Sequence, residues 1–237
     1  IFLITVLIAG ALGFYAYRVS GNLFISILAG IVTLVPASDI AVTGINWLTM
    51  RMIPPTFLPK MEYREGIPDE AATIVVIPAL LTSVEMVEKL LERLEIYYAG
   101  NKYKNIFFGL IGDFKDGKNE TEPEDEKIEN AAAEGIRRLN KKYGRDGDRF
   151  FYLHRRRQYN EKQKLWMGWE RKRGALVEFN EWLLGAKDTS FYRIVGNPAN
   201  LIGKIRYVIT LDADTRLYLD VARKLIGTIA HPLHHAV

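Results

Sequence analysis

Hydrophobic positions divide the chain into two unlike parts. The first 50 residues are almost continuously apolar and carry only two charged side chains, Arg18 and Asp39. From about residue 72 onward, short β-branched runs alternate with segments whose apolar residues recur every three or four positions. The first pattern is typical of membrane-spanning helices. The second is typical of a water-soluble domain in which strands and helices alternate.

Residues 1–50 are predicted to form a hairpin of two transmembrane helices. Residues 1–17 are uncharged and would cover about 25 Å as a helix, slightly less than the ~30 Å of a hydrocarbon core. A polar turn at residues 18–22 precedes a second apolar segment at residues 23–47. Two other interpretations stay open: a signal peptide at the first segment, or a buried helical hairpin of a soluble protein.

Two residues interrupt the second apolar segment. Pro36 predicts a kink in the helix, or the point where the helix nears the membrane surface. A carboxylate within a span is often functional. We interpret Asp39 instead as the cap of the next stretch, residues 40–50, which is amphipathic enough to lie along the membrane surface.

Residues 51–71 are predicted to form a proline-rich juxtamembrane linker, because four prolines exclude a continuous helix. Arg51, Lys60 and Arg64 place the domain that follows on the cytoplasmic side by the positive-inside rule. Arg18 argues weakly for the opposite orientation.

Residues 72–237 are predicted to be an α/β domain with a mainly parallel sheet flanked by helices. In such a sheet the chemistry lies beyond the carboxyl ends of the strands, which directs attention to Pro78, Asp113 and Asp212. Strands are predicted at 72–78, 105–111, 149–154 and 206–211, helices at 84–98 (capped by Ser83), 124–143 and 219–231, a loop and then a helix at 166–184, and an acidic loop at 112–126.

Composition excludes several classes of function. The chain has 237 residues and no cysteine, so it has no disulfide scaffold and no thiolate nucleophile or metal ligand. Its formal charge of +4 is too small to argue for a nucleic-acid partner. His231, His234 and His235 suggest zinc, but no carboxylate accompanies them, and we do not favour a metal site there.

The strongest local signal is YVITLDADT at residues 207–215, where an apolar strand ends in Asp212 and Asp214. Alternate residues of an extended chain share a face, so both carboxylates are expected to point at one site. Two adjacent hard oxygen ligands suit Mg²⁺ or Mn²⁺, with phosphates completing the metal shell. The alternative is a purely structural role, as an exposed Asp-rich turn that caps a helix.

Two chemistries use this motif. Nucleotide-sugar glycosyltransferases of the GT-A fold hold a metal on the diphosphate with it, and haloacid-dehalogenase-type phosphatases use its first Asp as nucleophile. The phosphatase motif ends the first strand of its domain. Here the motif ends the fourth predicted strand, and only 22 residues follow Thr215. The position favours the transferase.

Two basic segments are further candidates. WMGWERKRG at residues 166–174 places Lys172 and Arg173 beside two tryptophans and a glycine, which suits an anionic phosphate; a solvated start of a helix is the alternative. The sequence His-Arg-Arg-Arg at residues 154–157 suits phosphate, lipid headgroups or acidic partners, but a solvated loop is the favoured interpretation. Asp113 suits a contact to a base or ribose, or an ordinary turn.

Together these motifs resemble the glycosyltransferase domain of bacterial cyclic β-1,2-glucan synthases, and the likeness covers most of the chain. WMGWERKRG followed by YVITLDADT is its most specific part. The segments that carry it are PASD at 36–39 with Asn46, the prolines at 54–55 and 59, GIP at 66–68, VVIPALLTS at 75–83, residues 151–157 with Asn160, WMGWERKRG at 166–174, residues 178–180, YVITLDADT at 207–215 and AHPL at 230–233.

The resemblance implies the nucleotide-sugar-binding half of a GT-A domain that transfers glucose from UDP-glucose, with inversion, to a growing β-glucan at the bacterial inner membrane. It implies that Asp212 and Asp214 bind the metal and the diphosphate and that Asp113 contacts uridine. Lys172 and Arg173 would contact the uracil or diphosphate side. Pro78 and Ala79 would lie beside the nucleotide.

The chain departs from the family pattern at two positions, Ala79 in place of a small hydroxyl residue and Tyr218 in place of proline. It begins with isoleucine, and we expect an excerpt of a longer protein. The catalytic base and the acceptor-binding motif are expected beyond Val237, so the excerpt is expected to be inactive alone. The β-1,2 linkage of the glucan is implied by the resemblance alone.

Two rival hypotheses remain at this point. One is a membrane-anchored phosphatase that uses Asp212-Ala213-Asp214-Thr215. The other is a non-catalytic membrane-anchored binding domain. A downstream pair of acids would favour the transferase, and a downstream Lys and Asp would favour the phosphatase.

Overall fold

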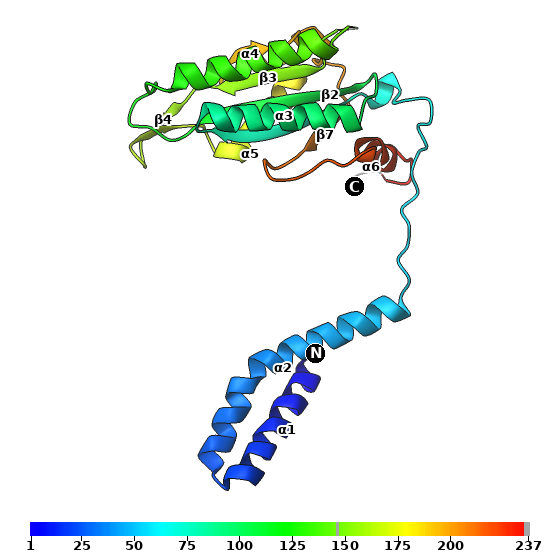
Figure 1. Ribbon diagram of the computed structural model, residues 1–237, viewed down its shortest axis with the longest axis vertical. Coiled ribbons are helices and arrows are strands. Elements are labelled where there is room, and N and C mark those ends of the chain that lie inside the picture. Colours follow the sequence, from blue (N-terminus) through cyan, green and yellow to red (C-terminus); the bar gives the residue numbers. More distant parts are fainter. Residues whose placement is uncertain (146, 235–237) are drawn as a thin grey trace. The chain divides into compact units, whose positions relative to one another are not determined.

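The computed structural model describes residues 1–145 and 147–234. The chain divides into two compact units, Ile1–Leu58 and Pro59–Val237. Both units are drawn in Figure 1.

The first unit is a helical hairpin of α1 (Phe2–Ser20) and α2 (Leu23–Met52). Gly21 ends α1 in the left-handed region with φ 63°, and the Asn22 side chain caps α2 by accepting from the amides of Phe24 and Ile25. Both helices are long and apolar enough to cross a membrane by length and composition.

Small residues let the two helices approach closely. The Ser26 hydroxyl donates to the Gly13 carbonyl at 2.7 Å. A Cβ at Gly13 would lie 3.1 Å from the Ser26 carbonyl oxygen, so the glycine keeps the contact free of strain. Close backbone approach of this kind is how apolar helices associate in lipid, where burial of apolar surface gives no driving force.

The prediction that Asp39 caps a separate helix is wrong. α2 runs without a break from Leu23 to Met52, and Asp39 is an exposed residue within it. Pro36 removes one backbone bond, whereas ending the helix would leave several carbonyls without partners, so the helix continues and bends instead. Figure 1 shows this change of direction along α2.

The second unit is a mixed sheet with helices on both faces. Its five-stranded sheet has the order β6-β3-β2-β1-β7, and only β6 is antiparallel to its neighbour. The predicted α/β class with a mainly parallel sheet is confirmed. The elements are β1 (Thr73–Leu81), α3 (Val84–Gly100), β2 (Ile106–Phe114), α4 (Asp125–Tyr143), β3 (Phe150–Arg155), β4 (Gln158–Asn160), β5 (Leu165–Met167), α5 (Arg171–Leu183), β6 (Phe191–Val195), β7 (Tyr207–Thr210) and α6 (Val221–Ile229), with short 3-10 turns at Asp69–Ala71 and Pro198–Asn200.

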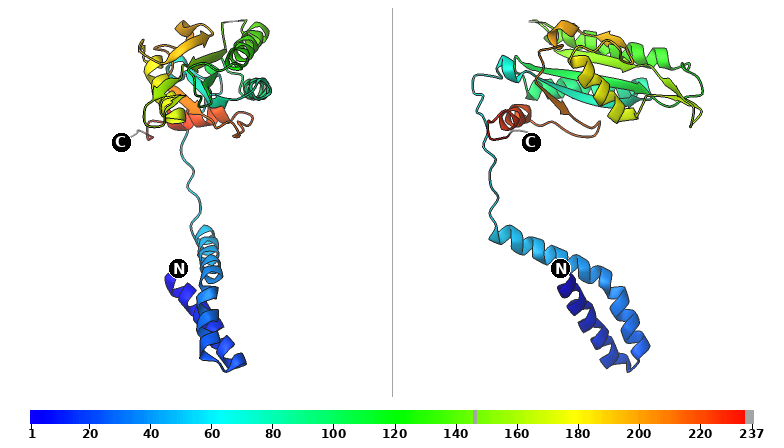
Figure 2. Two further views of the ribbon diagram at one scale, coloured as in Figure 1. Left: turned by 90° about the vertical axis from the view of Figure 1, so that its left-hand side faces the viewer. Right: turned by 180° about the vertical axis from the view of Figure 1, so that it is seen from behind.

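Alternation along β1, an interior strand, builds a separate core on each face of the sheet. Val75 and Ile77 of β1 pack with α3, α4 and α6. Ile74 and Val76 point the other way and pack with α5. The left-hand view of Figure 2 shows α3 and α4 on one side of the sheet and α5 on the other. A strand covered on both faces must be apolar throughout, as the sequence predicts for β1.

Several strands differ from their predicted bounds or were not predicted. β2 continues to Phe114, so Gly112 and Asp113 lie inside a strand and not in the predicted acidic loop. β6 and the β4–β5 hairpin were missed, because they are short and lack a continuous β-branched run.

β1 passes through Pro78 to Leu81, beyond its predicted end. The Arg206 and Leu211 amides donate to the carbonyls of Ala72 and Val76, so even-numbered positions of β1 face β7. The register of β1 with β7 stops at Val76. The backbone nitrogen of Pro78 therefore faces the β7 side of the strand, but β7 ends before this position. The lack of an N–H at Pro78 costs no hydrogen bond between strands.

The first and last described segments of the second unit are joined. The Met61 amide donates to the Gly227 carbonyl of α6 at 2.8 Å. A Cβ at Gly227 would overlap the Met61 carbonyl oxygen, so only glycine allows this approach. The end of the proline-rich linker is thus part of the fold of this unit.

Candidate functional site

A buried ion pair lies at the carboxyl edge of the sheet. Asp113 is next to last in β2, and Arg155 is the last residue of β3. The guanidinium donates to both carboxylate oxygens, from Nε at 2.8 Å and from Nη2 at 2.6 Å. Burial raises the pKa of Asp113 above its usual value, and the pairing with Arg155 opposes that shift.

Arg155 also fixes the segment that leads into α5. Its Nη1 donates to the Trp169 carbonyl at 3.0 Å, and its Nη2 donates to the Arg171 carbonyl at 2.9 Å. Its Nη1 lies 3.6 Å from a Glu178 carboxylate oxygen. The Arg155 side chain is wholly buried. It therefore connects β2, β3 and α5 through one group, four of whose five N–H groups donate hydrogen bonds.

The same segment carries unusual backbone. Glu170 and Arg171 both have positive φ, 45° and 49°. Non-glycine residues adopt this region at a cost, and they do so where surrounding contacts hold them. Arg155 holds the carbonyls, and the Arg171 side chain donates to Asp116 at 2.6 Å. A Cβ at Gly174 would overlap the Trp169 carbonyl oxygen, so the glycine is required for the turn.

Lys172, in the first turn of α5, forms an ion pair with Asp212 beyond the end of β7. Both side chains are about half exposed, at 50% and 60%. The two segments that the sequence singled out are therefore in contact. Asp214 is exposed close by in the chain.

The expectation that strand alternation aligns Asp212 and Asp214 is wrong in its premise. β7 ends at Thr210, and the Thr215 amide donates to the Asp212 carbonyl at 3.0 Å, so residues 212–215 form a turn. α3 contacts this turn, because the hydroxyl of its residue Tyr97 donates to the Thr215 carbonyl. The position of both carboxylates is set by the turn and by α3.

The other predicted donor contacts lie at the same edge but differ in access. Ala79 is opposite Gly112 in the register of β1 with β2, and Pro78 and Ala79 are both buried. Arg173 is 79% exposed and pairs locally with Glu170 at 2.5 Å. Lys172 and Asp212 are thus brought together, Asp113 is tied to the same segment through Arg155, and Arg173 is exposed and paired within its own segment.

The predicted solvated loop is wrong for two of its three arginines, at residues 155–157. His154, Arg155 and Arg157 are buried, and only Arg156 is exposed. Arg157 pairs with Asp125 of α4 and donates to the carbonyls of Lys115 and Glu120, which closes the loop after β2. The sequence held one signal for the Asp113–Arg155 pair: each residue comes at the end of an apolar strand, where an unpaired charge is very costly.

No histidine metal site is supported. His231 and His234 lie after α6, and His235 lies outside the described residues. Within residues 1–145 and 147–234, no group of three or more His, Asp and Glu side chains is arranged to hold a metal.

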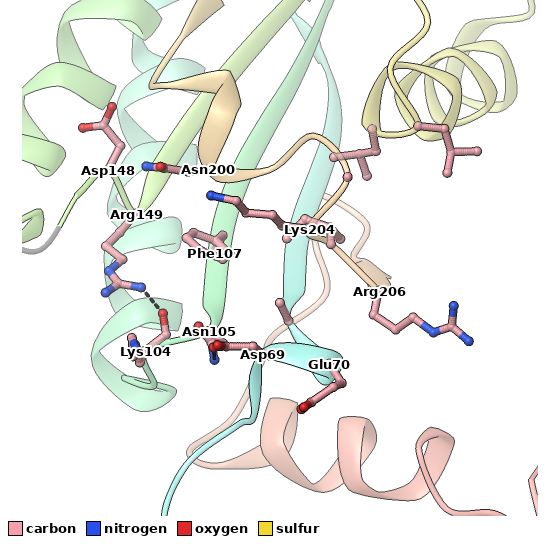
Figure 3. A pocket seen from close by; sticks show the side chains of 15 residues that line it. Asp69, Glu70, Lys104, Asn105, Phe107, Asp148, Arg149, Asn200, Lys204 and Arg206 are labelled. Carbon is pink, nitrogen blue, oxygen red and sulfur yellow. Dashed lines mark hydrogen bonds between the residues drawn. The ribbon is translucent and has the colours of Figure 1, made fainter.

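A hollow of about 830 Å³ lies at the opposite, amino-terminal edge of the sheet. Figure 3 shows Lys204 near Phe107 within it, and Arg149 turned toward the Lys104 carbonyl. Asp69 and Asp148 also line it, so charges of both signs are present. None of the predicted donor-site residues lines this hollow.

The comparisons with known proteins agree with the motifs. No family model matches the chain. Over 204 residues, 85% of its length, the chain is 42% identical to the cyclic β-(1,2)-glucan synthase NdvB of Rhizobium meliloti (strain 1021). The aligned region spans only 7% of that protein. The chain is therefore similar, over most of its length, to a short segment of a cyclic β-(1,2)-glucan synthase, which confirms the resemblance predicted from its motifs.

Proposed function

We propose that the chain is the donor-binding part of a membrane-bound, inverting glycosyltransferase that transfers glucose from UDP-glucose to a growing β-1,2-glucan. The observation that carries the proposal is the ion pair between Lys172 and Asp212. It joins a basic segment and an acidic turn, 40 positions apart, at the edge of the sheet where α/β proteins bind ligands. The proposed product, a β-1,2-glucan, is taken from the name of the similar protein, a cyclic β-(1,2)-glucan synthase.

The acidic turn fits a divalent cation of the Mg²⁺ or Mn²⁺ type. Asp212 and Asp214 are both exposed carboxylates. Such ions keep water and take phosphate oxygens, so two protein carboxylates suffice. A bound ion would stabilise the negative charge that develops on the leaving UDP.

Each remaining residue has a proposed part. Lys172 would donate to the diphosphate, and Arg173 would add positive charge on the same side. Asp113 would accept from the uridine with the lone pairs that Arg155 leaves free. Pro78 and Ala79 would form the buried wall beside the nucleotide. The group that deprotonates the acceptor hydroxyl is not assigned within this chain.

The two apolar helices support a place in the bacterial inner membrane, in contact with lipid. With Arg51, Lys60 and Arg64 just beyond them, the second unit would face the cytoplasm. UDP-glucose is made in that compartment. The phosphatase alternative is less well supported, because six strands precede β7 and the Asp-x-Asp motif, whereas the phosphatase motif ends the first strand of its domain.

The test is a calorimetric titration of the full chain in detergent with UDP-glucose and with UDP, each with and without Mn²⁺. The variant is Asp212→Ala/Asp214→Ala, and the matched control is Glu181→Ala/Asp188→Ala, which removes two exposed acids elsewhere. Metal-dependent binding that only the first variant loses supports the proposal. Equal binding by both variants, or no binding by a chain that circular dichroism shows to be folded, contradicts it.

A further inference from the structure

A pocket of about 590 Å³ adjoins the segment before α5, outside the residues proposed above to bind the donor. Two aromatic side chains line it and stay accessible: Tyr159 is 52% exposed and Trp169 is 45% exposed. Gln158 and Gln163, both exposed, add neutral amides to the same wall. The volume lies within the range of small-molecule sites.

The pocket is built on fixed backbone. The β4–β5 hairpin is bonded to the loop after β2, since Gly117 and Trp166 exchange amide–carbonyl bonds of 2.9 Å in both directions. The Asn160 carboxamide oxygen accepts from the amides of Lys162 and Gln163 at 3.1 Å, which orders the tip of the hairpin. Figure 1 shows the hairpin at one end of the sheet, beside the β4 label.

The backbone of Trp169 is also held by contacts with neighbouring segments. Buried Arg155 binds its carbonyl, and the close approach of Gly174 fixes its backbone. Tyr and Trp rings turn about only two side-chain torsions, so they lose little conformational entropy when a ligand stacks on them. Rings of this kind, together with amide donors and acceptors, suit a neutral polyhydroxylated ligand whose apolar C–H faces meet the aromatic surface.

The charges at the pocket favour a neutral ligand over a phosphate. Arg171 is paired with Asp116 at 2.6 Å, and Glu170 is paired with Arg173 at 2.5 Å. The charged side chains that line the pocket are therefore already neutralised by neighbours, whereas the glutamine amides remain available. Trp169 stands three positions before Lys172, so a ligand here would border the donor site.

We propose that this pocket is a subsite for glucosyl units of the acceptor chain, with Tyr159 and Trp169 as stacking platforms. The inference rests on the proposed function, because it takes the ligand to be a glucan. It adds to that function a binding position for the acceptor within this chain.

The test titrates the full chain with β-1,2-linked gluco-oligosaccharides, without nucleotide or metal, in a detergent that carries no sugar headgroup. Tyr159→Ala and Gln163→Ala are the variants; both remove exposed side chains, and circular dichroism checks the fold. Tyr218→Ala, which removes a ring that is 69% exposed outside this pocket, is the matched control. We expect Tyr159→Ala to weaken oligosaccharide binding at least tenfold and Tyr218→Ala to leave it unchanged.

The UDP-glucose titration with Mn²⁺ runs in parallel on the same samples. Oligosaccharide binding that Tyr159→Ala weakens, with UDP-glucose binding intact, supports the subsite. UDP-glucose binding without oligosaccharide binding overturns the subsite and leaves the donor site standing. Loss of UDP binding in Tyr159→Ala would make the pocket a nucleoside site and overturn the proposal, as would equal weakening in Tyr218→Ala.

Discussion

Arg155 and Arg156 are neighbours in the chain with opposite surroundings. Arg155 is wholly buried and pairs with Asp113, whereas Arg156 is exposed. Replacing Arg155 leaves an uncompensated buried carboxylate and frees two carbonyls, so Arg155→Met is expected to lower the free energy of unfolding by about 3–5 kcal/mol. Arg156→Met is expected to change it by less than ~0.5 kcal/mol. Urea denaturation followed by tryptophan fluorescence compares the two, and equal losses would contradict the assignment.

His154 gives the molecule a defined response to pH. Burial lowers the pKa of His154 from 6.5 to about 3, and the Tyr152 hydroxyl lies 2.6 Å from its Nδ1. Below pH 6.5 His154 is protonated in the unfolded chain but stays neutral in the folded chain. Stability is therefore expected to fall as the pH drops from about 6.5 toward 3, with a slope approaching ~1.4 kcal/mol per pH unit.

The measurement is the free energy of unfolding between pH 5 and 7 for the natural chain and for His154→Gln. Carboxylates titrate mostly below this window. The variant should lose the slope that His154 contributes while remaining folded at neutral pH. A slope that is identical in both chains would show that another group is responsible.

For single residues, the sequence identified two segments that come into contact, but it did not predict which charged side chains are buried. Lys172 and Asp212 were singled out separately, and the structure pairs them. Arg155 and Arg157 were misjudged, because a run of charged residues has the same composition whether it is solvated or buried. Only the tertiary pairing with Asp113 and Asp125 makes burial of these arginines possible, and a single sequence does not show which strands are neighbours.

At the scale of elements, the predictions held where a long pattern governs. α3 and α4 were recognised from their apolar spacing, and the four parallel strands were recognised from apolar runs. β6 and the β4–β5 hairpin depend on tertiary pairing, so local composition did not reveal them. The continuous α2 likewise shows that a proline and an aspartate do not end a helix whose flanks are strongly apolar.

The start of α5 offers a test at this scale. A Cβ at Gly174 would overlap the Trp169 carbonyl oxygen and displace the segment that carries Lys172. Gly174→Ala is expected to weaken UDP-glucose binding at least tenfold while the far-ultraviolet circular dichroism is retained. Gly44→Ala in α2 is the matched control, since a Cβ there meets nothing within 4 Å. Unchanged affinity in Gly174→Ala would separate this turn from the donor site.

For the whole molecule, the segment between the two units is the natural place for cleavage. It contains no helix or strand after Met52, and Phe57 is 92% exposed. Brief chymotrypsin treatment is expected to cut after Phe57 and release the second unit in folded form. In a Triton X-114 phase separation, that fragment should enter the aqueous phase while the helical hairpin stays with detergent.

Phe57→Ser is the control, and it should slow the cleavage. A fragment that remains in the detergent phase would contradict the assignment of all membrane affinity to the first 58 residues.

The position of β1 between β2 and β7 sets an order of assembly during synthesis. Among the described strands of this sheet, β1 is translated first and β7 last. Until residue 210 has been made, one edge of this wholly apolar strand has no partner, and such an edge invites pairing with other chains. The helical hairpin is translated before β1. Its insertion into a membrane would hold each nascent chain in place, apart from its neighbours, until β7 is made and pairs with β1.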